Sequence, residues 1–194
     1  ADGAAIELGA WTHANNQQWK ISNTEKGWSR IDARVSGRAL ATCDGLKQVT
    51  FKAGTACQQF RLQPLGALAI ANVNSGKPLA KAPNDDTIVQ LGKAGTPAAT
   101  WQWEHQADGY YHVVQDGGCL TRAASSAGLT RQTCGSDATQ LWRFDMLNDG
   151  TIRLVASDTG KVIDIANCLS ANGTRAQQWI WLNNFCQKFR LLPG

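Results

Sequence analysis

The sequence lacks long apolar runs and blocks of like charge. No stretch of its 194 residues approaches the roughly 18 apolar residues that a membrane-spanning helix needs. Its 19 lysines and arginines are scattered among 15 acidic residues, which gives a net charge of +4. Scattered charge is typical of a solvated surface and not of a site for nucleic acid or anionic membranes. We therefore expect no membrane span and no nucleic-acid partner.

Helical patterning is missing as well. No segment has a sustained apolar stripe with a period of 3.6 residues and helix caps, so we expect no long helix. Short alternating runs occur instead, such as WSRIDARV (28–35) and TIRLVAS (151–157). Such runs, bounded by Gly, Asn and Asp, are typical of strands joined by tight turns. The sequence therefore predicts an all-β protein.

Catalytic and metal-binding patterns are also missing. A glycosidase needs two carboxylates that face each other across the scissile bond, and the 15 acids are scattered over predicted turns. A Ser-His-Asp arrangement needs a histidine oriented by an acid, whereas His105 and His112 fall in predicted strands. The three histidines are not spaced as zinc ligands, and there is no Cys-x-x-Cys. We expect no catalytic residues, no metal and no cofactor.

A Gln-x-aromatic phrase recurs along the chain. It occurs as QQWKI (17–21), QQFRL (58–62), QLWRF (140–144) and QKFRL (187–191), with a degenerate copy, WQWEH, at 101–105. The predicted repeated aromatics are Trp19, Phe60, Trp103, Trp142 and Phe189. They are 41, 43, 39 and 47 residues apart, which indicates a repeat of about 42 residues.

A second phrase, a small residue followed by Gly and an apolar residue, precedes four of these copies. It occurs at 36–40, 75–79, 117–120 and 159–163. Together the two phrases define four repeats of about four short strands, at 22–65, 66–106, 107–147 and 148–194. Residues 1–21 align without a gap to 171–191, so they are predicted to be half of another repeat. Several units must stack, because one cannot bury its own apolar face.

The six cysteines fall in three pairs inside separate repeats: Cys43 and Cys57, Cys119 and Cys134, Cys168 and Cys186. Each pair would close a short loop, which stabilises a fold by ~3 kcal/mol in the chain-entropy model. Six cysteines allow 15 pairings, but confinement to separate repeats favours the sequential one. Disulfides in turn favour an oxidising compartment, and the chain begins at Ala1 as a processed protein or an excised fragment would.

Steady repeats with a Gln-x-Trp phrase, and the segment CLTRAASSAGLTRQTC (119–134), resemble the ricin B-type β-trefoil lectins and carbohydrate-binding modules over essentially the whole chain. The resemblance implies three four-stranded repeats around a pseudo-threefold axis and up to one sugar pocket per repeat. Three repeats make a trefoil, so we expect a complete trefoil at 66–194 and a partial trefoil of one and a half repeats at 1–65. The alternative is a trefoil closed over 22–147. A partial trefoil exposes apolar surface and would need another chain or domain to complete it.

The resemblance places the best carbohydrate pocket in the last repeat. In this family a carboxylate and amides bind sugar hydroxyls, and an aromatic ring covers the apolar face of the sugar. The matching residues are Asp164, Asn167, Gln177, Trp179, Trp181, Asn184 and Gln187. Cys186 stands where the family has Asn, and Asn183 or Asn184 is the expected substitute.

The other repeats match this pattern less well. Their acidic position has Ala41, Ala80 or Thr121, and their expected aromatic positions have Phe51, Gly92 or Gln132. We therefore expect non-catalytic binding of glycans or glycoconjugates by a secreted lectin or carbohydrate-binding module. The alternative is a protein-binding trefoil, such as a toxin delivery subunit or a protease inhibitor.

Overall fold

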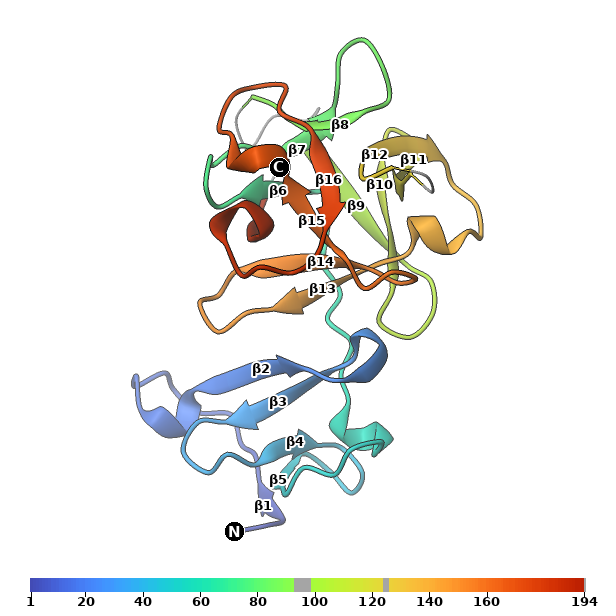
Figure 1. Cartoon of the computed structure of the whole chain (residues 1–194). Helices are drawn as coiled ribbons and strands as arrows, with labels where there is room; N and C mark the ends of the chain where they lie inside the picture. The colour runs from blue at the N-terminus through green and yellow to red at the C-terminus, as the bar shows by residue number, and fades with distance from the viewer. Residues whose placement is uncertain (93–98, 124–125, 194) are drawn as a thin grey trace. The chain divides into compact units, whose positions relative to one another are not determined.

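A computed structural model describes residues 1–92, 99–123 and 126–193 (Figure 1). The chain divides into two compact units, Ala1–Leu62 and Gln63–Gly194, named here the N-terminal unit and the C-terminal unit. The described residues form 17 strands and several short 3-10 turns, with no α-helix. The predicted all-β fold is confirmed. The predicted assignment of repeats to the domains 1–65 and 66–194 stays a prediction.

The N-terminal unit is an antiparallel sheet with the strand order β1-β5-β4-β3-β2. Its strands are β1 (Ala4–Ala5), β2 (Trp19–Asn23), β3 (Ser29–Ala33), β4 (Ala39–Ala41) and β5 (Lys47–Val49). An isolated bridge between Ser29 and Phe60 joins the end of the unit to β3. Five strands are what one repeat and the second half of another would supply, and the assignment of this unit as a partial trefoil stays a prediction.

The described residues of the C-terminal unit form twelve strands, four in each of three successive segments. They are β6 (Leu68–Asn72), β7 (Leu79–Lys81), β8 (Ile88–Gln90), β9 (Thr100–His105), β10 (Tyr111–Gln115), β11 (Gly118–Arg122), β12 (Leu129–Thr133), β13 (Trp142–Met146), β14 (Ile152–Ala156), β15 (Val162–Ile165), β16 (Ala176–Trp179) and β17 (Phe189–Pro193).

Six of these strands close a barrel. Neighbouring strands pair antiparallel in the cyclic order β6-β9-β10-β13-β14-β17, and β17 pairs again with β6. The remaining strands form the hairpins β7–β8, β11–β12 and β15–β16, which isolated bridges link to one another. A six-stranded barrel with three linked hairpins is the β-trefoil that the sequence predicts.

The glutamine of the repeated phrase stabilises the loop that precedes the repeated aromatic residue. Gln17, Gln58, Gln140 and Gln187 each end a 3-10 turn. Each accepts a hydrogen bond from a backbone N–H five or six residues earlier and donates one to a carbonyl seven or eight residues earlier. Because these backbone groups then have partners, the amide stabilises the loop. The phrase recurs for this structural reason, whatever the loops bind.

The degenerate copy of the phrase is shifted by two residues from its predicted position. Trp101 and Trp142 are both fully buried, and each indole N–H donates to a carbonyl 22 residues upstream, in Leu79 and Leu120, at 2.8 Å. Trp101 is therefore the repeated aromatic, and the prediction of Trp103 is wrong. Ala99 stands at the glutamine position. The corrected spacings of the aromatics are 41, 41, 41 and 47 residues.

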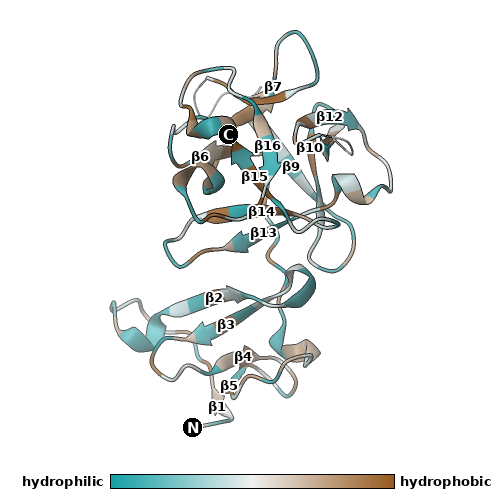
Figure 2. Ribbon diagram, in the orientation of Figure 1, coloured by the Kyte–Doolittle hydropathy of each residue, from teal (hydrophilic) through white to brown (hydrophobic). Residues whose placement is uncertain are grey.

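The core of the C-terminal unit lies where the barrel and the hairpins bury apolar residues. Figure 2 shows hydrophobic segments on β7 and β14, whereas many of the connecting turns are hydrophilic. The fully buried large side chains include Trp101, Trp142, Tyr111, Phe189, Ile70 and Leu154. Each segment supplies at least one of them. The core therefore depends on all three segments together, as stacking of the repeats requires.

Three disulfides pair the cysteines in the predicted sequential order, Cys43–Cys57, Cys119–Cys134 and Cys168–Cys186. No cysteine is free. The paired residues are 14, 15 and 18 positions apart, so each bond closes a loop inside one repeat. In the last repeat, the bond ties the turn after β15 to the turn before β17.

Candidate functional site

The carboxylate of the predicted sugar pocket lies on a hairpin of the last repeat. Asp164 on β15 is paired across the hairpin with Gln177 on β16, and the Gln177 Nε2 donates to the Asp164 Oδ2 at 2.9 Å. Asp164 is only 6% exposed. Burial raises the pKa of the Asp164 carboxyl, and hydrogen bonds from the Gln177 and Gln187 amides offset part of that rise. Asp164 is thus a mostly buried carboxylate that needs hydrogen-bond donors.

An exposed aromatic ring lies on the same face of this hairpin. Trp179 follows Gln177 by two positions on β16, and alternate residues of a strand face the same side. The Trp179 side chain remains 46% exposed although its neighbour Gln178 is buried. An exposed tryptophan beside a carboxylate and an amide offers a flat apolar surface next to hydrogen-bonding groups. This combination suits a sugar ring, which has an apolar CH face and hydroxyl edges.

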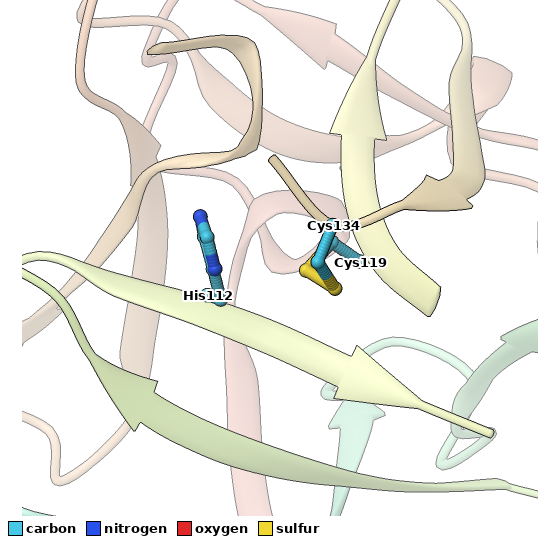
Figure 3. A group of neighbouring side chains, drawn as sticks. All are labelled: His112, Cys119 and Cys134. Carbon is cyan, nitrogen blue, oxygen red and sulfur yellow. A yellow bond between two sulfur atoms is a disulfide. The ribbon is translucent and has the colours of Figure 1, made fainter. Parts of the chain in front are cut away.

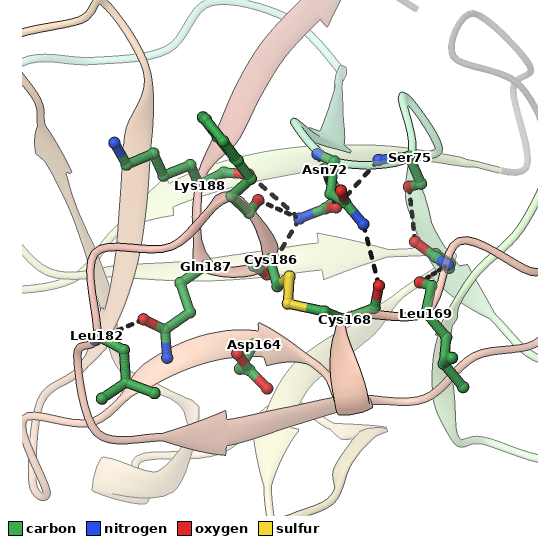
Figure 4. The surroundings of a disulfide bond; sticks show 12 residues. Asn72, Ser75, Asp164, Cys168, Leu169, Leu182, Cys186, Gln187 and Lys188 are labelled. Atoms are coloured by element: carbon green, nitrogen blue, oxygen red, sulfur yellow. Dashed lines mark hydrogen bonds between the residues drawn. A yellow bond between two sulfur atoms is a disulfide. The ribbon is translucent and has the colours of Figure 1, made fainter.

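Gln187 lies next to Asp164 and stabilises the loop that follows Trp179. It is fully buried, its Oε1 accepts from the Leu182 N–H at 2.7 Å, and its Nε2 donates to the Ile180 carbonyl at 2.8 Å. Figure 4 shows the Gln187 amide between Leu182 and the Asp164 carboxyl. Gln187 therefore stabilises the 180–182 segment and lies next to the Asp164 carboxyl.

The other predicted site residues are less closely connected to Asp164. Asn167 is exposed on a 3-10 turn in the left-handed conformation, with a φ of 53°. The Arg153 guanidinium covers Trp181, with 4.9 Å from its Cζ to the ring centroid. The Asn184 Oδ1 is buried without a hydrogen-bond partner in the part of the chain that the structure describes. The structure brings together Asp164, Gln177, Trp179 and Gln187, and a role in binding for all seven residues stays a prediction.

The register of the other hairpins shows what stands at the equivalent positions. Pairing places Ala41, Ala80 and Thr121 where the last repeat has Asp164. The residues at the position of Trp179 are Val49, Leu91 and Gln132. The aromatic positions expected at Phe51 and Gly92 are therefore wrong. Among the described residues, only the last repeat has both a carboxylate and an aromatic ring at these positions.

A cluster of His112, Cys119 and Cys134 has ligand atoms within 4.8 Å of one another. Figure 3 shows that the two sulfurs are joined to each other while the His112 ring lies to one side. Zinc binds cysteine as a thiolate, and a disulfide offers none. In this oxidised form the cluster does not supply the ligands that a zinc site needs.

Sequence reasoning missed the ionic group beneath Trp181. Asp145 on β13 is 1% exposed and accepts from the Arg143 Nε at 3.0 Å and from the Arg153 Nε at 2.9 Å. Arg153 in turn covers Trp181. The alternation of Arg143 and Asp145 within WRFD was a signal that both face one side of a strand, and Arg153 lies directly opposite Asp145 in the same hairpin.

The C-terminal unit resembles known lectin domains in sequence and in structure. Residues 97–179 match the sequence profile of the family described as ricin-type beta-trefoil lectin domain-like. No curated protein sequence matches the chain significantly. The designed threefold-symmetric protein ThreeFoil has a TM-score of 0.62 and 25% identity, over 66% of this chain and 98% of that one.

Natural proteins with similar structures include a lectin and an enzyme. The ricin B-like lectin of Macrolepiota procera, solved with lactose, has a TM-score of 0.59 and 13% identity over 70% of this chain and 100% of that one. The exo-beta-1,3-galactanase of Clostridium thermocellum has a TM-score of 0.60 and 19% identity over 90% of this chain. The alignment spans 45% of that enzyme. At such low sequence identities, these structural similarities indicate a shared fold and nothing more.

The barrel with its three hairpins defines the C-terminal unit as a β-trefoil. The profile match within it confirms the resemblance of this unit to the ricin-type β-trefoil lectin-like domains. The described residues also contain no helix that is long and apolar enough to cross a membrane.

Proposed function

We propose that the chain binds carbohydrate without catalysis, through a pocket formed by Asp164, Gln177 and Trp179. The observation that carries this proposal is the buried Asp164 carboxylate, which accepts from Gln177 beside the exposed Trp179 ring. Two adjacent sugar hydroxyls would donate to Asp164 and accept from Gln177, while the CH face of the sugar would lie on Trp179. The three disulfides support placing this lectin in an oxidising, extracellular setting.

A glycan array tests this proposal with two site variants and one control. Asp164→Asn and Trp179→Ala are expected to lower binding by about tenfold to a hundredfold, because each removes a charge-assisted hydrogen bond or the stacking surface. Glu104→Gln, which removes an exposed acid of β9, should bind like the wild type. Lactose is the first soluble probe, since the Macrolepiota procera lectin was solved with it. The proposal is contradicted if the folded wild-type protein binds no glycan. It is also contradicted if the Asp164→Asn variant binds as well as the wild type.

The Asp164→Asn variant also has an expected stability that separates lost binding from lost folding. Because the pKa of Asp164 is raised in the folded state, its ionised form opposes folding above that pKa. The variant should therefore unfold at the same or a higher temperature than the wild type at neutral pH. A residue kept at a cost to stability is typical of a functional site.

Sugar affinity is expected to fall with acidification. The bound sugar hydroxyl donates to the ionised Asp164, and a protonated carboxyl loses that acceptor. Because burial raises the pKa of Asp164, the loss should begin at a higher pH than for an exposed aspartate. Calorimetric titration between pH 7 and pH 4, with folding checked at each pH, measures this. Affinity that stays constant over the range in which the protein is folded would remove Asp164 from the site.

A further inference from the structure

A separate pocket of about 420 Å³ lies in the N-terminal unit. It is bounded by the end of β2, by β3 and by the chain after β5, and its lining includes Ser22, Thr24, Arg30, Phe51 and Gln59. The Arg30 guanidinium lies over the Phe51 ring, with 4.4 Å from its Cζ to the ring centroid. The Phe51 ring thus holds the Arg30 guanidinium in position at the wall of the pocket.

The Arg30 guanidinium is only partly used. Its Nε donates to the Asp32 Oδ2 at 2.7 Å, whereas its two terminal nitrogens have no hydrogen-bond partner within the described residues. The Arg30 side chain keeps 32% of its surface exposed. Thr24 also lines the pocket, and its hydroxyl is buried without a partner in the same part of the chain. Two terminal nitrogens of a planar guanidinium form a fork that matches a carboxylate.

The C-terminal unit shows what fills the equivalent position there. The pairing of Trp19 with Ala33 matches that of Trp142 with Ala156, which aligns Arg30 with Arg153. Arg153 also covers an aromatic ring, and its partner is the Asp145 carboxylate, with 2.8 Å between the Arg153 Nη2 and the Asp145 Oδ2.

In the N-terminal unit this carboxylate is absent. By the same strand register, Ser22 stands at the position of Asp145, and the exposed Lys20 stands at the position of Arg143. Asp32 supplies a carboxylate to the Arg30 Nε alone. A short hydroxyl therefore replaces the acid that binds the arginine fork in the other unit, and the open volume lies beside it.

We propose that this pocket binds the carboxylate of an acidic sugar, a hexuronate, on the terminal nitrogens of Arg30. Ser22 and Gln59 also line the pocket and offer polar groups for the hydroxyls of such a sugar. Glu25 also lines the pocket and is exposed. Its negative charge disfavours dianionic phosphate and polysulfated ligands, and so favours a single carboxylate. The saccharide part of this inference rests on the proposed lectin function, whereas the pocket is separate from Asp164.

Amide NMR titration of the full chain with sodium glucuronate, against glucose at equal ionic strength, tests this inference. Glucuronate should shift amides around Arg30 and Phe51 with a dissociation constant in the millimolar range, and glucose should not. Arg30→Gln should weaken binding about tenfold or more, because a charge-assisted fork is lost. Arg30→Lys should also weaken it, since a lysine keeps the charge but not the fork.

Arg30→Gln removes the partner of the mostly buried Asp32 and can therefore destabilise the fold. A second variant that keeps Arg30 separates lost binding from misfolding. Ser22→Asp keeps Arg30 and restores the carboxylate found at Asp145, so it should occupy the fork and block glucuronate. Asp164→Asn should lose neutral-sugar binding and retain the glucuronate shifts. The inference is overturned if glucuronate shifts no amides between residues 20 and 60, if Arg30→Gln or Ser22→Asp binds it unchanged, or if acetate or sulfate shifts the same amides as strongly. These results would leave the Asp164 site untouched.

Discussion

Replacing Asp145 with alanine is expected to destabilise the C-terminal unit by about 3 kcal/mol, as is found when one partner of a buried ion pair is removed. The Asp145 side chain is 2% exposed and lies between the guanidinium groups of Arg143 and Arg153. Without it, two positive charges on neighbouring strands face each other. Burial alone would lower the pKa of Arg143, and the Asp145 carboxylate reverses this. Because both arginines keep about a quarter of their side chains exposed, partial hydration limits the loss.

Asp86 offers a matched control for this variant. It also contacts two cations, at 3.3 Å from the Arg131 Nη2 and at 4.0 Å from the Lys81 Nζ, but its side chain is 58% exposed. Exposed ion pairs contribute roughly 0–1 kcal/mol, so Asp86→Ala should cost much less. Urea unfolding with intact disulfides, followed by amide NMR signals of the C-terminal unit, separates its transition from that of the N-terminal unit. Equal losses for the two variants would show that burial of the carboxylate is not what makes Asp145 important.

The repeats could be predicted because the same backbone hydrogen-bonding requirement recurs in each of these loops. Each loop that ends at Gln17, Gln58, Gln140 or Gln187 has backbone groups that need partners, and the glutamine supplies them in each case. The Asp164–Gln177 pair could be predicted for a related reason. The two residues lie on adjacent strands of one hairpin, so their spacing along the chain sets their register.

The aromatic partners of the arginines could not be predicted, because each ring comes from a loop later in the chain. Arg153 lies opposite Asp145 in one hairpin, but it also covers Trp181, a residue of a later loop. Nothing in the local sequence around Arg153 states which ring it meets. For the same reason Phe51 was predicted as a sugar platform, whereas the structure places the Arg30 guanidinium over its ring. A cation on one face of a ring changes what that ring can bind.

The position of the core tryptophan could not be read either, because 101–105 has two tryptophans on alternate positions of one strand. Both face the interior, at 0% exposure for Trp101 and 5% for Trp103, and the usual marker glutamine is replaced by Ala99. A pattern of alternation fits either assignment. What distinguishes them is a single long-range hydrogen bond from the Trp101 indole to the Leu79 carbonyl.

Replacing Trp101 with alanine is expected to cost about 3–5 kcal/mol, the range for removing a large buried aromatic side chain. Phenylalanine substitutions at the two tryptophans then separate their roles. Trp101→Phe keeps most of the packing, since Phe60 and Phe189 occupy this position in other repeats, but it loses the bond to Leu79. Its expected cost is about 1–3 kcal/mol. Trp103→Phe should be close to neutral, because the Trp103 indole N–H is buried without a hydrogen-bond partner in the described residues.

Urea unfolding measures the free energy of unfolding of these variants. The packing of Trp103 makes it a suitable comparison for Trp101. Trp103 packs edge-on against Phe144, with ring centroids 5.3 Å apart, and a phenylalanine retains part of that contact. The cavity left by the smaller ring destabilises, whereas removal of the unpaired donor stabilises, so the two effects offset each other. If Trp103→Phe proved the more damaging of the two, the 41-residue period through Trp101 would be wrong and the original assignment of the repeat would stand.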